Sequence, residues 1–406
     1  MKPTSVNDRG FTLLEVMIAS ALGVIVLTTG LVVGTQMQKR ALFEEQTMVA
    51  QITGRAVKEQ LTSDLSRAGA GMGNTPISFS DTNLSSALMV WSKPDLKTAV
   101  GTTLTPDPDF VPAPTEDLKS DAIQVYWGST RDMLTLRTCG GTTMRDTTDA
   151  LGKTFCTTVS PSAALATGGS VPVVFVSGGN KLACPGTLDS VDTAGAKLTL
   201  KNPFTSTYCL NADTWKPDTT AKDPENWLAL RLDGAAYRVN WKGNIPTLEY
   251  QSPGMTTWAV LSRDVEQMTV REGVMDFDTL KTSLDWYPGD NSYNVGVQHP
   301  PISQCTRALF DSKACFLGKA LDGTDIPKPA TDEELIRQLR QRVRLLEVSL
   351  VIRTRRVNQD AVLTGTDEEG YARDGYKRRR FTFMVEPRNF ASVGLVRLKL
   401  KEEASK

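Results

Sequence analysis

Histidine is almost absent from this sequence of 406 residues, which contains His299 and no other. A metal site that uses two or more imidazoles is therefore excluded, and a Ser-His-Asp arrangement would have to use this one residue. The sequence also lacks the G-x-S-x-G motif that presents a nucleophilic serine. His299 stands before two prolines, so we interpret it as a loop residue. These absences predict no enzyme activity, no catalytic residue and no cofactor.

Sequence motifs for metals and nucleotides are missing as well. None of the six cysteines forms a C-x-x-C pair, which argues against a thiolate zinc cluster. Acidic clusters at residues 107–109, 322–325 and 367–369 lack the full spacing and distal glutamate of a calcium loop, so we predict solvated turns there. The glycine-rich segment 69–73 follows a helical pattern, whereas a nucleotide-binding glycine loop follows a strand and precedes a helix.

An excess of charge of either sign is also missing, because 46 basic and 46 acidic residues cancel. No global field therefore draws the protein to nucleic acid or anionic lipid, and a basic surface must be local. The basic run at 377–380 is such a place, with four arginines upstream of it: Arg337, Arg340, Arg342 and Arg344. Phosphate contacts need no sequence motif, so DNA is an alternative partner for this surface. We favour pairing with carboxylates or a subunit interface, and nucleic acid is not an expected partner.

One hydrophobic run is long, and it contains a single ionisable group. Residues 11–35 are apolar or small except for Glu15 and a few hydroxyl residues. As a helix rising 1.5 Å per residue, about 25 residues cross a hydrocarbon core of roughly 30 Å. A secretory signal is the alternative, since Ala19 and Ala21 form a weak A-x-A-like site. Roughly fourteen apolar or small residues follow that site, which favours a membrane-spanning helix instead.

The helical pattern continues beyond this run while its surface becomes amphipathic. Apolar residues between 42 and 65 recur mostly at spacings of three, four or seven, with charged residues between them. Glycines at 69–73 suit the end of a helix, so we predict one helix from Phe11 to Ala68. Each interior glycine costs up to about 1 kcal/mol relative to alanine, which suggests soft points or close-packing positions. These glycines are Gly23, Gly30, Gly34 and Gly54.

The remainder of the sequence is predicted to form strands separated by turn-rich segments. Residues 121–127 and 133–137 are expected to form a hairpin or two adjacent strands, and 171–176 a short buried strand. Alternating apolar residues at 346–352 predict a strand with one buried face, and those at 396–400 an exposed final strand. Further strands are predicted at 227–241, 247–251, 265–271 and 381–385.

All six cysteines lie beyond the membrane-length run. An even number of cysteines suits disulfides in an oxidising compartment such as the periplasm or the cell surface. The sequence leaves their pairing open, with a preference for cysteines that are sequence neighbours. The candidates are Cys139, Cys156, Cys184, Cys209, Cys305 and Cys315.

Residues 10–15, Gly-Phe-Thr-Leu-Leu-Glu, resemble the class III signal of type IV pilins and type II secretion pseudopilins. The resemblance implies that a prepilin peptidase cuts after Gly10 and methylates the new N-terminal Phe11. It also implies an intersubunit contact between Glu15 and the amino terminus of an adjacent subunit. A carboxylate at membrane depth costs about 2.5 to 3.5 kcal/mol and usually marks such a functional pairing. The alternative is that Glu15 snorkels to the headgroups from the end of the helix.

Internal segments narrow the resemblance to PilW-like minor pilins of the type IV pilin superfamily. Four segments are similar to that family in the same order, at residues 61–69, 265–274, 347–356 and 378–389. Two departures are Glu272, where an aromatic residue is expected, and Pro387, which interrupts the last segment. The implied fold is α+β and type IV pilin-like, with a long N-terminal α-helix packed on an antiparallel β-sheet domain with disulfide-bonded loop insertions.

The resemblance also implies how the chain is divided into segments. These are a leader peptide at 1–10, a transmembrane half-helix at 11–35, an amphipathic periplasmic half-helix at 36–70 and a β-rich globular domain at 71–406. The implied location is the inner membrane, with a single pass and a periplasmic domain, and then the pilus at the cell surface.

The implied function is that of a minor pilin that takes part in initiating type IV pilus assembly. It would be a low-copy or tip subunit that supports adhesion and twitching motility. Expected partners are other minor pilins, the major pilin, the prepilin peptidase, the inner-membrane assembly platform and a PilY-type tip adhesin. An alternative in the same superfamily is a GspJ-like minor pseudopilin of a type II secretion system. A membrane-anchored periplasmic enzyme is the alternative of another class.

Overall fold

The computed structural model shows a long N-terminal helix followed by antiparallel β-strands, so the predicted α+β fold class is confirmed. It describes residues 12–73, 75–98, 104, 106–162, 165, 170–177, 182–217, 227–275, 284–290, 296–316, 318, 324, 326–355, 357, 362–367 and 370–387. These residues divide between two compact units. The helix unit is drawn from 1–52 and 354–378, and the sheet unit from 53–353 and 379–406.

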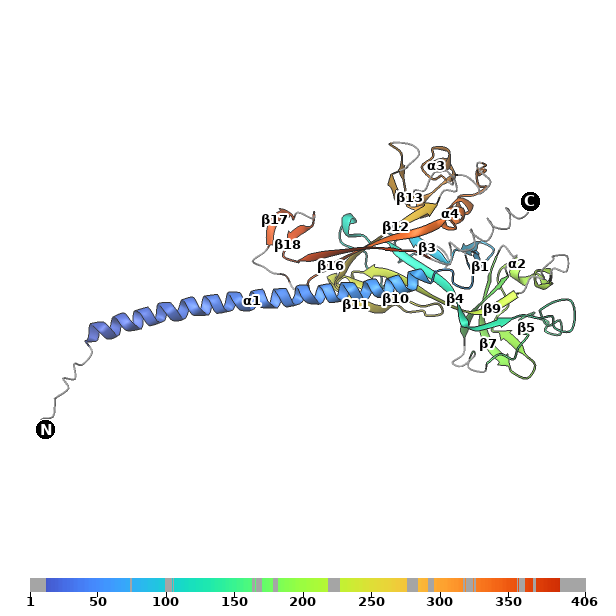
Figure 1. Cartoon of the computed structure of the whole chain (residues 1–406), viewed down its shortest axis with the longest axis horizontal. Helices are drawn as coiled ribbons and strands as arrows, with labels where there is room; N and C mark the ends of the chain where they lie inside the picture. The colour runs from blue at the N-terminus through green and yellow to red at the C-terminus, as the bar shows by residue number, and fades with distance from the viewer. Residues whose placement is uncertain are drawn as a thin grey trace, which may run out of the picture. The chain divides into compact units, whose positions relative to one another are not determined.

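Helix α1 (Leu13–Ser66) is a single helix of 54 residues, drawn in blue in Figure 1. At 1.5 Å rise per residue it is about 81 Å long. It ends at the predicted glycines, because Gly69, Gly71 and Gly73 have φ angles of 74°, 72° and 62°. This left-handed conformation favours glycine and stops a helix. The Gly69 amide donates to the carbonyl of Tyr126 at 2.9 Å, which connects the end of α1 to strand β4 (Ala122–Thr135).

The helix unit also contains a short antiparallel hairpin that is not among the predicted strands. Its strands are β17 (Val362–Thr366) and β18 (Ala372–Asp374). The Tyr371 amide donates to the Asp367 carboxylate at 2.8 Å, which closes the connection between the strands. The guanidinium of Arg378 then donates to both carboxylate oxygens of Asp374 at 2.8 Å.

The larger sheet of the sheet unit has nine strands, with the long strand β9 (Trp227–Asn240) at its centre (Figure 1). β4 pairs along one edge of β9, and β3 (Leu88–Trp91) continues the sheet beyond β4. Two strands share the other edge of β9. Of these, β10 (Thr247–Gln251) pairs with residues 236–240 and β6 (Val171–Ser177) with residues 227–231. The outer strands are β11 (Ala259–Arg263), β7 (Cys184–Asp192), β8 (Lys197–Leu200) and β5 (Thr154–Cys156).

A second sheet of four strands has the order β13 (Leu284–Tyr287), β12 (Val265–Met275), β16 (Val343–Arg353) and β19 (Arg378–Val385). β12 and β16 lie side by side, with Val265 opposite Ile352 and Val274 opposite Val343 (Figure 1). The C-terminal part of α1 packs against β19, since a Cβ placed on Gly54 would lie 2.4 Å from the Phe381 ring. Gly54 is therefore a close-packing position, one of the two roles predicted for the interior glycines.

Smaller elements complete the sheet unit. Two short antiparallel pairs join β1 (Ile77–Ser80) to β2 (Asn83–Ser85) and β14 (Gly289–Asp290) to β15 (Gln298–His299). The α-helices are α2 (Thr207–Leu210), α3 (Arg307–Asp311) and α4 (Asp332–Arg340). Short 3-10 turns occupy Glu116–Leu118, Ala212–Trp215, Lys242–Asn244 and Ile302–Gln304.

Two local predictions are wrong. The segments 121–127 and 133–137 form one strand, β4, because the turn-rich residues between them are accommodated as an irregularity while β9 pairs on both sides of it. His299 is part of the two-residue strand β15, which pairs with β14, and is not a loop residue. The other predicted strands appear close to their expected positions, apart from 396–400, which lies outside the described residues.

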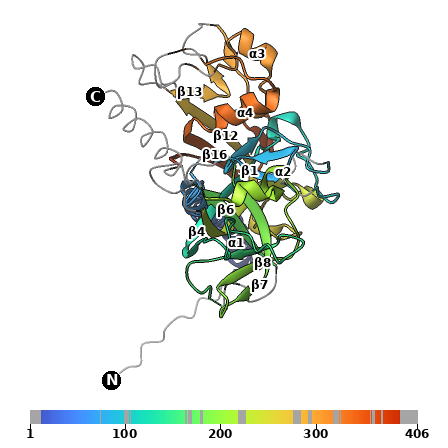
Figure 2. The same ribbon diagram turned by 90° about the vertical axis from the view of Figure 1, so that its right-hand side faces the viewer.

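Three disulfides close loops of the sheet unit, and each joins cysteines that are sequence neighbours. They are Cys139–Cys156, Cys184–Cys209 and Cys305–Cys315. The first two border an aromatic core around β5, β6 and α2; β6 and α2 are labelled in Figure 2. There the buried rings of Trp215 and Trp227 lie 4.4 Å apart between centroids, and the Trp215 indole donates to the Cys209 carbonyl at 2.8 Å. Core packing and covalent bridges thus hold the same long loops.

Candidate functional site

Helix α1 begins with reciprocal hydrogen bonds between Thr12 and Glu15. The Glu15 amide donates to the Thr12 hydroxyl at 3.3 Å, and Oε2 of Glu15 accepts from the Thr12 amide and hydroxyl, each at 3.0 Å. This is a capping box, in which a threonine before the helix and a glutamate three residues later satisfy the exposed backbone donors. The T-x-x-E spacing of residues 12–15 is the sequence signal of a capping box. This signal was missed, because Glu15 was considered only as a pairing or snorkelling carboxylate.

The capping box gives Glu15 a role within its own chain and leaves part of the carboxylate available. Oε2 makes both contacts with Thr12, and Oε1 has no hydrogen bond to any of the described residues. Gly10 and Phe11, the predicted cleavage and methylation residues, lie outside the described residues. The intersubunit contact of Glu15 therefore stays a prediction.

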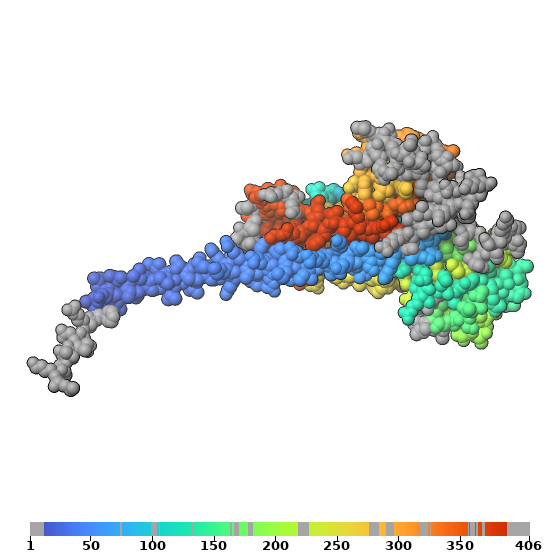
Figure 3. Space-filling view, in the orientation of Figure 1, coloured from blue at the N-terminus to red at the C-terminus, as the bar shows by residue number. Residues whose placement is uncertain are grey.

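The first part of α1 has an apolar surface that the described residues leave uncovered. Leu13 is 80% exposed and Leu31 is 68% exposed, and the large apolar residues between them are all more than half exposed (Figure 3, blue). A Cβ added at Gly23, Gly30 or Gly34 would meet nothing within 4 Å. By length and composition this helix could cross a membrane. An exposed apolar surface of this size is typical of a membrane or subunit contact.

Hydroxyl groups on the same part of α1 are satisfied by the helix itself. Each donates to a carbonyl three or four residues earlier, at 2.9 or 3.0 Å. Hydrocarbon offers no water to a polar group, so internal partners of this kind suit a membrane segment. The residues are Ser20, Thr28, Thr29 and Thr35.

Comparison with known proteins gives one match, at this end of the chain. Residues 6–31 match the family model described as the prokaryotic N-terminal methylation motif. The N-terminal segment is a type IV pilin-like prepilin signal. A prepilin signal implies processing by the prepilin peptidase machinery and association with a membrane. No curated protein and no solved structure matches the chain.

His299, the one histidine, is enclosed by contacts of a structural kind. Its Nδ1 lies 2.6 Å from the Ala314 carbonyl oxygen, and its ring stacks on Tyr287 with centroids 4.2 Å apart. Nε2 lies 4.0 Å from the carboxylate of Asp285. Across the described part of the chain, no three His, Cys, Asp or Glu side chains are grouped so that they could hold a metal ion.

Three of the basic residues near the C-terminus contact separate protein acceptors. Arg340 is buried and donates to the Val90 carbonyl at 3.1 Å, and Arg337 lies 3.8 Å from Glu334. In the basic run itself, Arg378 forms an ion pair with Asp374, the last residue of β18. These contacts are of the carboxylate-pairing and structural kind that the sequence favours over DNA.

A buried carboxyl group in β12 is a feature that the sequence analysis missed. Glu272 is 2% exposed, and its Oε1 has no hydrogen bond to any described residue. Burial raises the pKa of Glu272 to about 8, an effect that Arg340 opposes and Asp121 strengthens. Arg340 is buried as well, which lowers its own pKa. The sequence did contain a signal of this burial. The resemblance leads one to expect an aromatic residue at position 272, and an aromatic position in a strand indicates a buried side chain.

Proposed function

We propose that the protein is a minor pilin of a type IV pilus. It would be made as a prepilin, cut between Gly10 and Phe11, methylated on Phe11 and held in the inner membrane by residues 11–35. Residues 71–406 would lie in the periplasm and, after assembly, at the cell surface. The observation that carries this proposal is the prepilin signal at residues 6–31, of which residues 13–31 lie on a helix with an uncovered apolar surface.

The continuity of α1 supports a retained filament helix over a secretory signal peptide, which would be cleaved off and lost. The same 54-residue helix carries the exposed Leu13 and Leu31 near its start and the fully buried Leu61 and Leu65 near its end. Cleavage at an A-x-A-like site would cut through this helix, whereas cleavage after Gly10 leaves it whole. The retained apolar surface can then contact first lipid and afterwards the helices of other subunits.

The bulk of the chain supports a low-copy role. The main segment of the sheet unit spans about 300 residues, and a regular shaft would have to accommodate that volume in every subunit. We therefore propose a subunit that initiates assembly and stays near the tip, where it supports adhesion and twitching. Its partners would be other minor pilins, the major pilin, the prepilin peptidase, the inner-membrane platform and a PilY-type adhesin.

Processing is tested by mass spectrometry of the N-terminus of the protein from its own cells. The mature chain should begin at methylated Phe11. A chain that begins at Met1, or one that is cut near Ala21, would overturn the proposal.

Assembly is tested by variants that separate the charge of Glu15 from its capping role. Glu15→Gln removes the charge but keeps a side chain that can complete a capping box, so it should be cut normally yet be several-fold depleted from sheared filaments. Thr12→Val removes the capping hydroxyl and keeps the charge, and it should be incorporated nearly as well as wild type. Quantitative immunoblots of membrane and filament fractions measure both. Depletion of Thr12→Val together with normal incorporation of Glu15→Gln would mean that Glu15 acts only as a helix cap.

Deletion of the gene separates the two filament systems. We expect loss of surface pili and twitching. Loss of enzyme secretion with intact pili would assign the chain to a type II secretion pseudopilus instead.

A further inference from the structure

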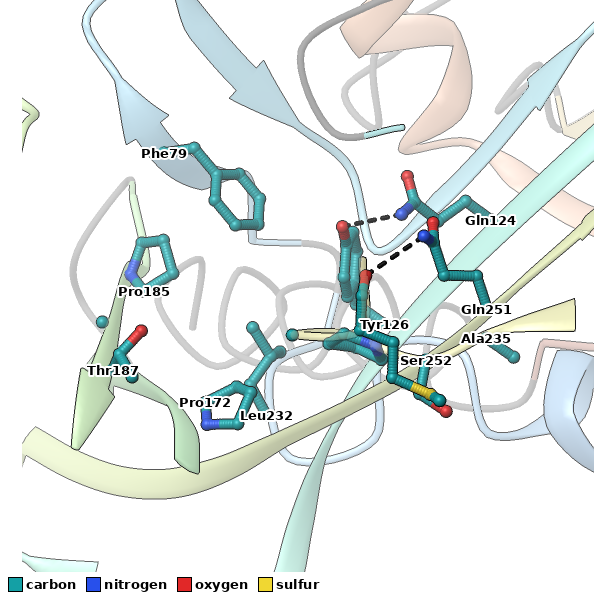
Figure 4. A pocket seen from close by; sticks show the side chains of 14 residues that line it. Phe79, Gln124, Tyr126, Pro172, Pro185, Thr187, Leu232, Ala235, Gln251 and Ser252 are labelled. Atoms are coloured by element: carbon teal, nitrogen blue, oxygen red, sulfur yellow. Dashed lines mark hydrogen bonds between the residues drawn. The ribbon is translucent and has the colours of Figure 1, made fainter. Parts of the chain in front are cut away.

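A pocket lies at a gap in the nine-stranded sheet (Figure 4). Because β6 and β10 pair with different parts of the same edge of β9, residues 232–235 have no partner strand on that edge. The loop after β10, residues 252–255, comes close to the start of β6, where a Cβ on Gly254 would lie 3.2 Å from Pro172. The space enclosed between these segments is about 290 Å³.

Strand β9 contributes Leu232 and Ala235 to the lining of the pocket, and Gly234 lies between them in the chain. A Cβ on Gly234 would lie 2.5 Å from the Val125 carbonyl oxygen and 2.9 Å from both Pro253 and the Tyr126 ring, so this close approach requires glycine. The Tyr126 main chain lies opposite Gly234 but bonds elsewhere, donating to Ala87 and accepting from Gly69. In an antiparallel pair of this kind, the amide and carbonyl of Gly234 point away from β4 and into the gap.

On that edge, Gly234 forms no hydrogen bond to any described residue. A backbone donor and acceptor side by side without protein partners are satisfied by water or by a ligand. Because β6 and β10 stop short of each other, unpaired backbone groups of β9 remain at residues 232–235, and we call this place the polar notch.

Polar side chains from several strands surround this notch. Gln124 and Tyr126 come from β4, Gln251 from β10 and Thr187 from β7 (Figure 4). Gln124 donates to the Tyr126 hydroxyl at 2.8 Å, and Gln251 donates to a carbonyl of the following loop at 3.1 Å, so both amides are held in place. Gln251 is 5% exposed, and its carbonyl oxygen has no hydrogen bond among the described residues. None of the described residues that line the pocket has a charged side chain.

Apolar faces complete the walls. The rings of Phe79 and Tyr126 lie 5.8 Å apart between centroids and are tilted by 44°. Pro172, Pro185 and Pro253 add rigid apolar surface around the opening. Aromatic and proline faces contact the CH groups of a ring well, while amides and hydroxyls fix its orientation.

The dimensions and the lining select a compact, uncharged ligand. An added peptide strand could pair with β9 only over residues 232–235, about 13 Å at 3.3 Å per residue, because β6 and β10 block both ends. An ionised ligand would lose hydration without gaining a counter-charge. A ring that carries several hydroxyls can both donate to and accept from the mixed amides and hydroxyls. The volume is just below the range of about 300–1,000 Å³ typical of ligand pockets, which suits a single ring.

We propose that this pocket binds one neutral hexopyranose unit of a glycan. Its hydroxyls would bond to the main chain of Gly234 and to the side chains of Gln251 and Thr187. One CH face of the ring would lie against Tyr126 and Phe79. The pocket belongs to the sheet unit alone, so the inference does not depend on the proposed filament role.

The test uses the full chain in detergent micelles and saturation-transfer NMR. The probes are D-glucose, D-galactose and N-acetyl-D-glucosamine, with D-glucosamine and D-glucuronic acid as charged rings of the same size. At least one neutral sugar should bind saturably in the millimolar range, and its charged relatives should bind at least about tenfold more weakly. Binding of charged and neutral rings alike would overturn the proposal.

Variants locate the binding in the pocket. Thr187→Val keeps the size of the side chain and removes one hydroxyl, so affinity should fall about fivefold. Gln251→Leu should reduce it about tenfold or more. Thr269→Val on β12 is the matched control, a half-buried strand threonine outside the pocket, and should bind as wild type. The thermal unfolding midpoint of each variant shows that it is folded.

Three other outcomes count against the proposal. They are no saturable binding of any neutral sugar, binding that neither pocket variant weakens, and binding of a short proline-rich peptide in place of the sugars. The last outcome would assign the pocket to a peptide.

Discussion

At the scale of single residues, Glu272 is a carboxyl group that folding moves into surroundings where its charged form is disfavoured. Its ordinary pKa is 4.5, and burial in β12 raises it to about 8. The folded chain therefore holds a proton that the unfolded chain releases across this range. The contribution of this proton to stability is complete below pH 4.5, declines as the pH rises and is lost above about pH 8.

Replacement by glutamine imitates the protonated form at every pH. Relative to wild type, Glu272→Gln should gain unfolding free energy by up to about 1.4 kcal/mol for each pH unit between 4.5 and 8. Urea denaturation of the full chain in detergent at several pH values measures the difference. Glu347→Gln is the control, because Glu347 on the neighbouring strand is half-buried and paired with Arg271 at 3.1 Å. Parallel stability curves for wild type and Glu272→Gln would contradict the prediction.

Residues that belong to a local sequence motif could be singled out from the sequence, whereas contacts between distant residues could not. Glu15 was singled out because it follows Gly10 and Phe11 at the spacing of the prepilin signal. The capping role of Thr12 could have been predicted from the T-x-x-E spacing of residues 12–15. The alternation of Met268 and Val270 places position 272 on the buried face of β12. Its charged neighbour Arg340 comes from α4, however, and no spacing in the sequence brings the two together.

At the scale of elements, the contact between α1 and β19 depends on the missing side chain of Gly54. Gly54→Leu should displace the Phe381 ring and lower the unfolding free energy of the sheet unit by about 1–3 kcal/mol. Denaturation followed by tryptophan fluorescence measures this change. Gly34→Leu is the matched control, since nothing lies within 4 Å of a Cβ at that position, and it should leave the same transition unchanged.

A compensating substitution tests the cause of that loss. Phe381→Ala removes the ring that a leucine at position 54 would strike, so the double variant should lose less stability than the sum of the two single variants. Simple additivity would mean that Gly54 matters through the conformation of the helix and not through packing.

Element positions followed from sequence patterns, but strand pairing did not. Alternating apolar residues placed β9, β10 and β16 near their observed limits, because period-two burial is a local property. The pairing of β9 with β4, β6 and β10 joins segments far apart in the chain. The single strand β4 was missed for the same reason, since its partner carries pairing across residues that read locally as a turn.

At the scale of the whole molecule, a motif of 26 residues identifies a processing route for a chain of 406. The long helix, the antiparallel sheets and the presence of disulfides could be predicted from composition and resemblance. The β17–β18 hairpin could not be predicted, because its strands are short. The membership of residues 354–378 in the helix unit depends on contacts between residues far apart in the chain. The pocket could not be predicted either, because it forms where β6 and β10 pair with the same edge of β9.

The bulk of the sheet unit leads to a prediction about copy number in the filament. About 300 residues in one segment of that unit, carried on one helix, would crowd a shaft in which every subunit repeats at short intervals. Immunogold labelling with antibodies to the sheet unit should therefore mark filament ends or sparse sites. Antibodies to the major pilin should mark the whole length of the same filaments, which controls for access of the label. Evenly spaced sheet-unit label along the shaft would show that the filament accommodates this bulk in every repeat, and the low-copy role would then be wrong.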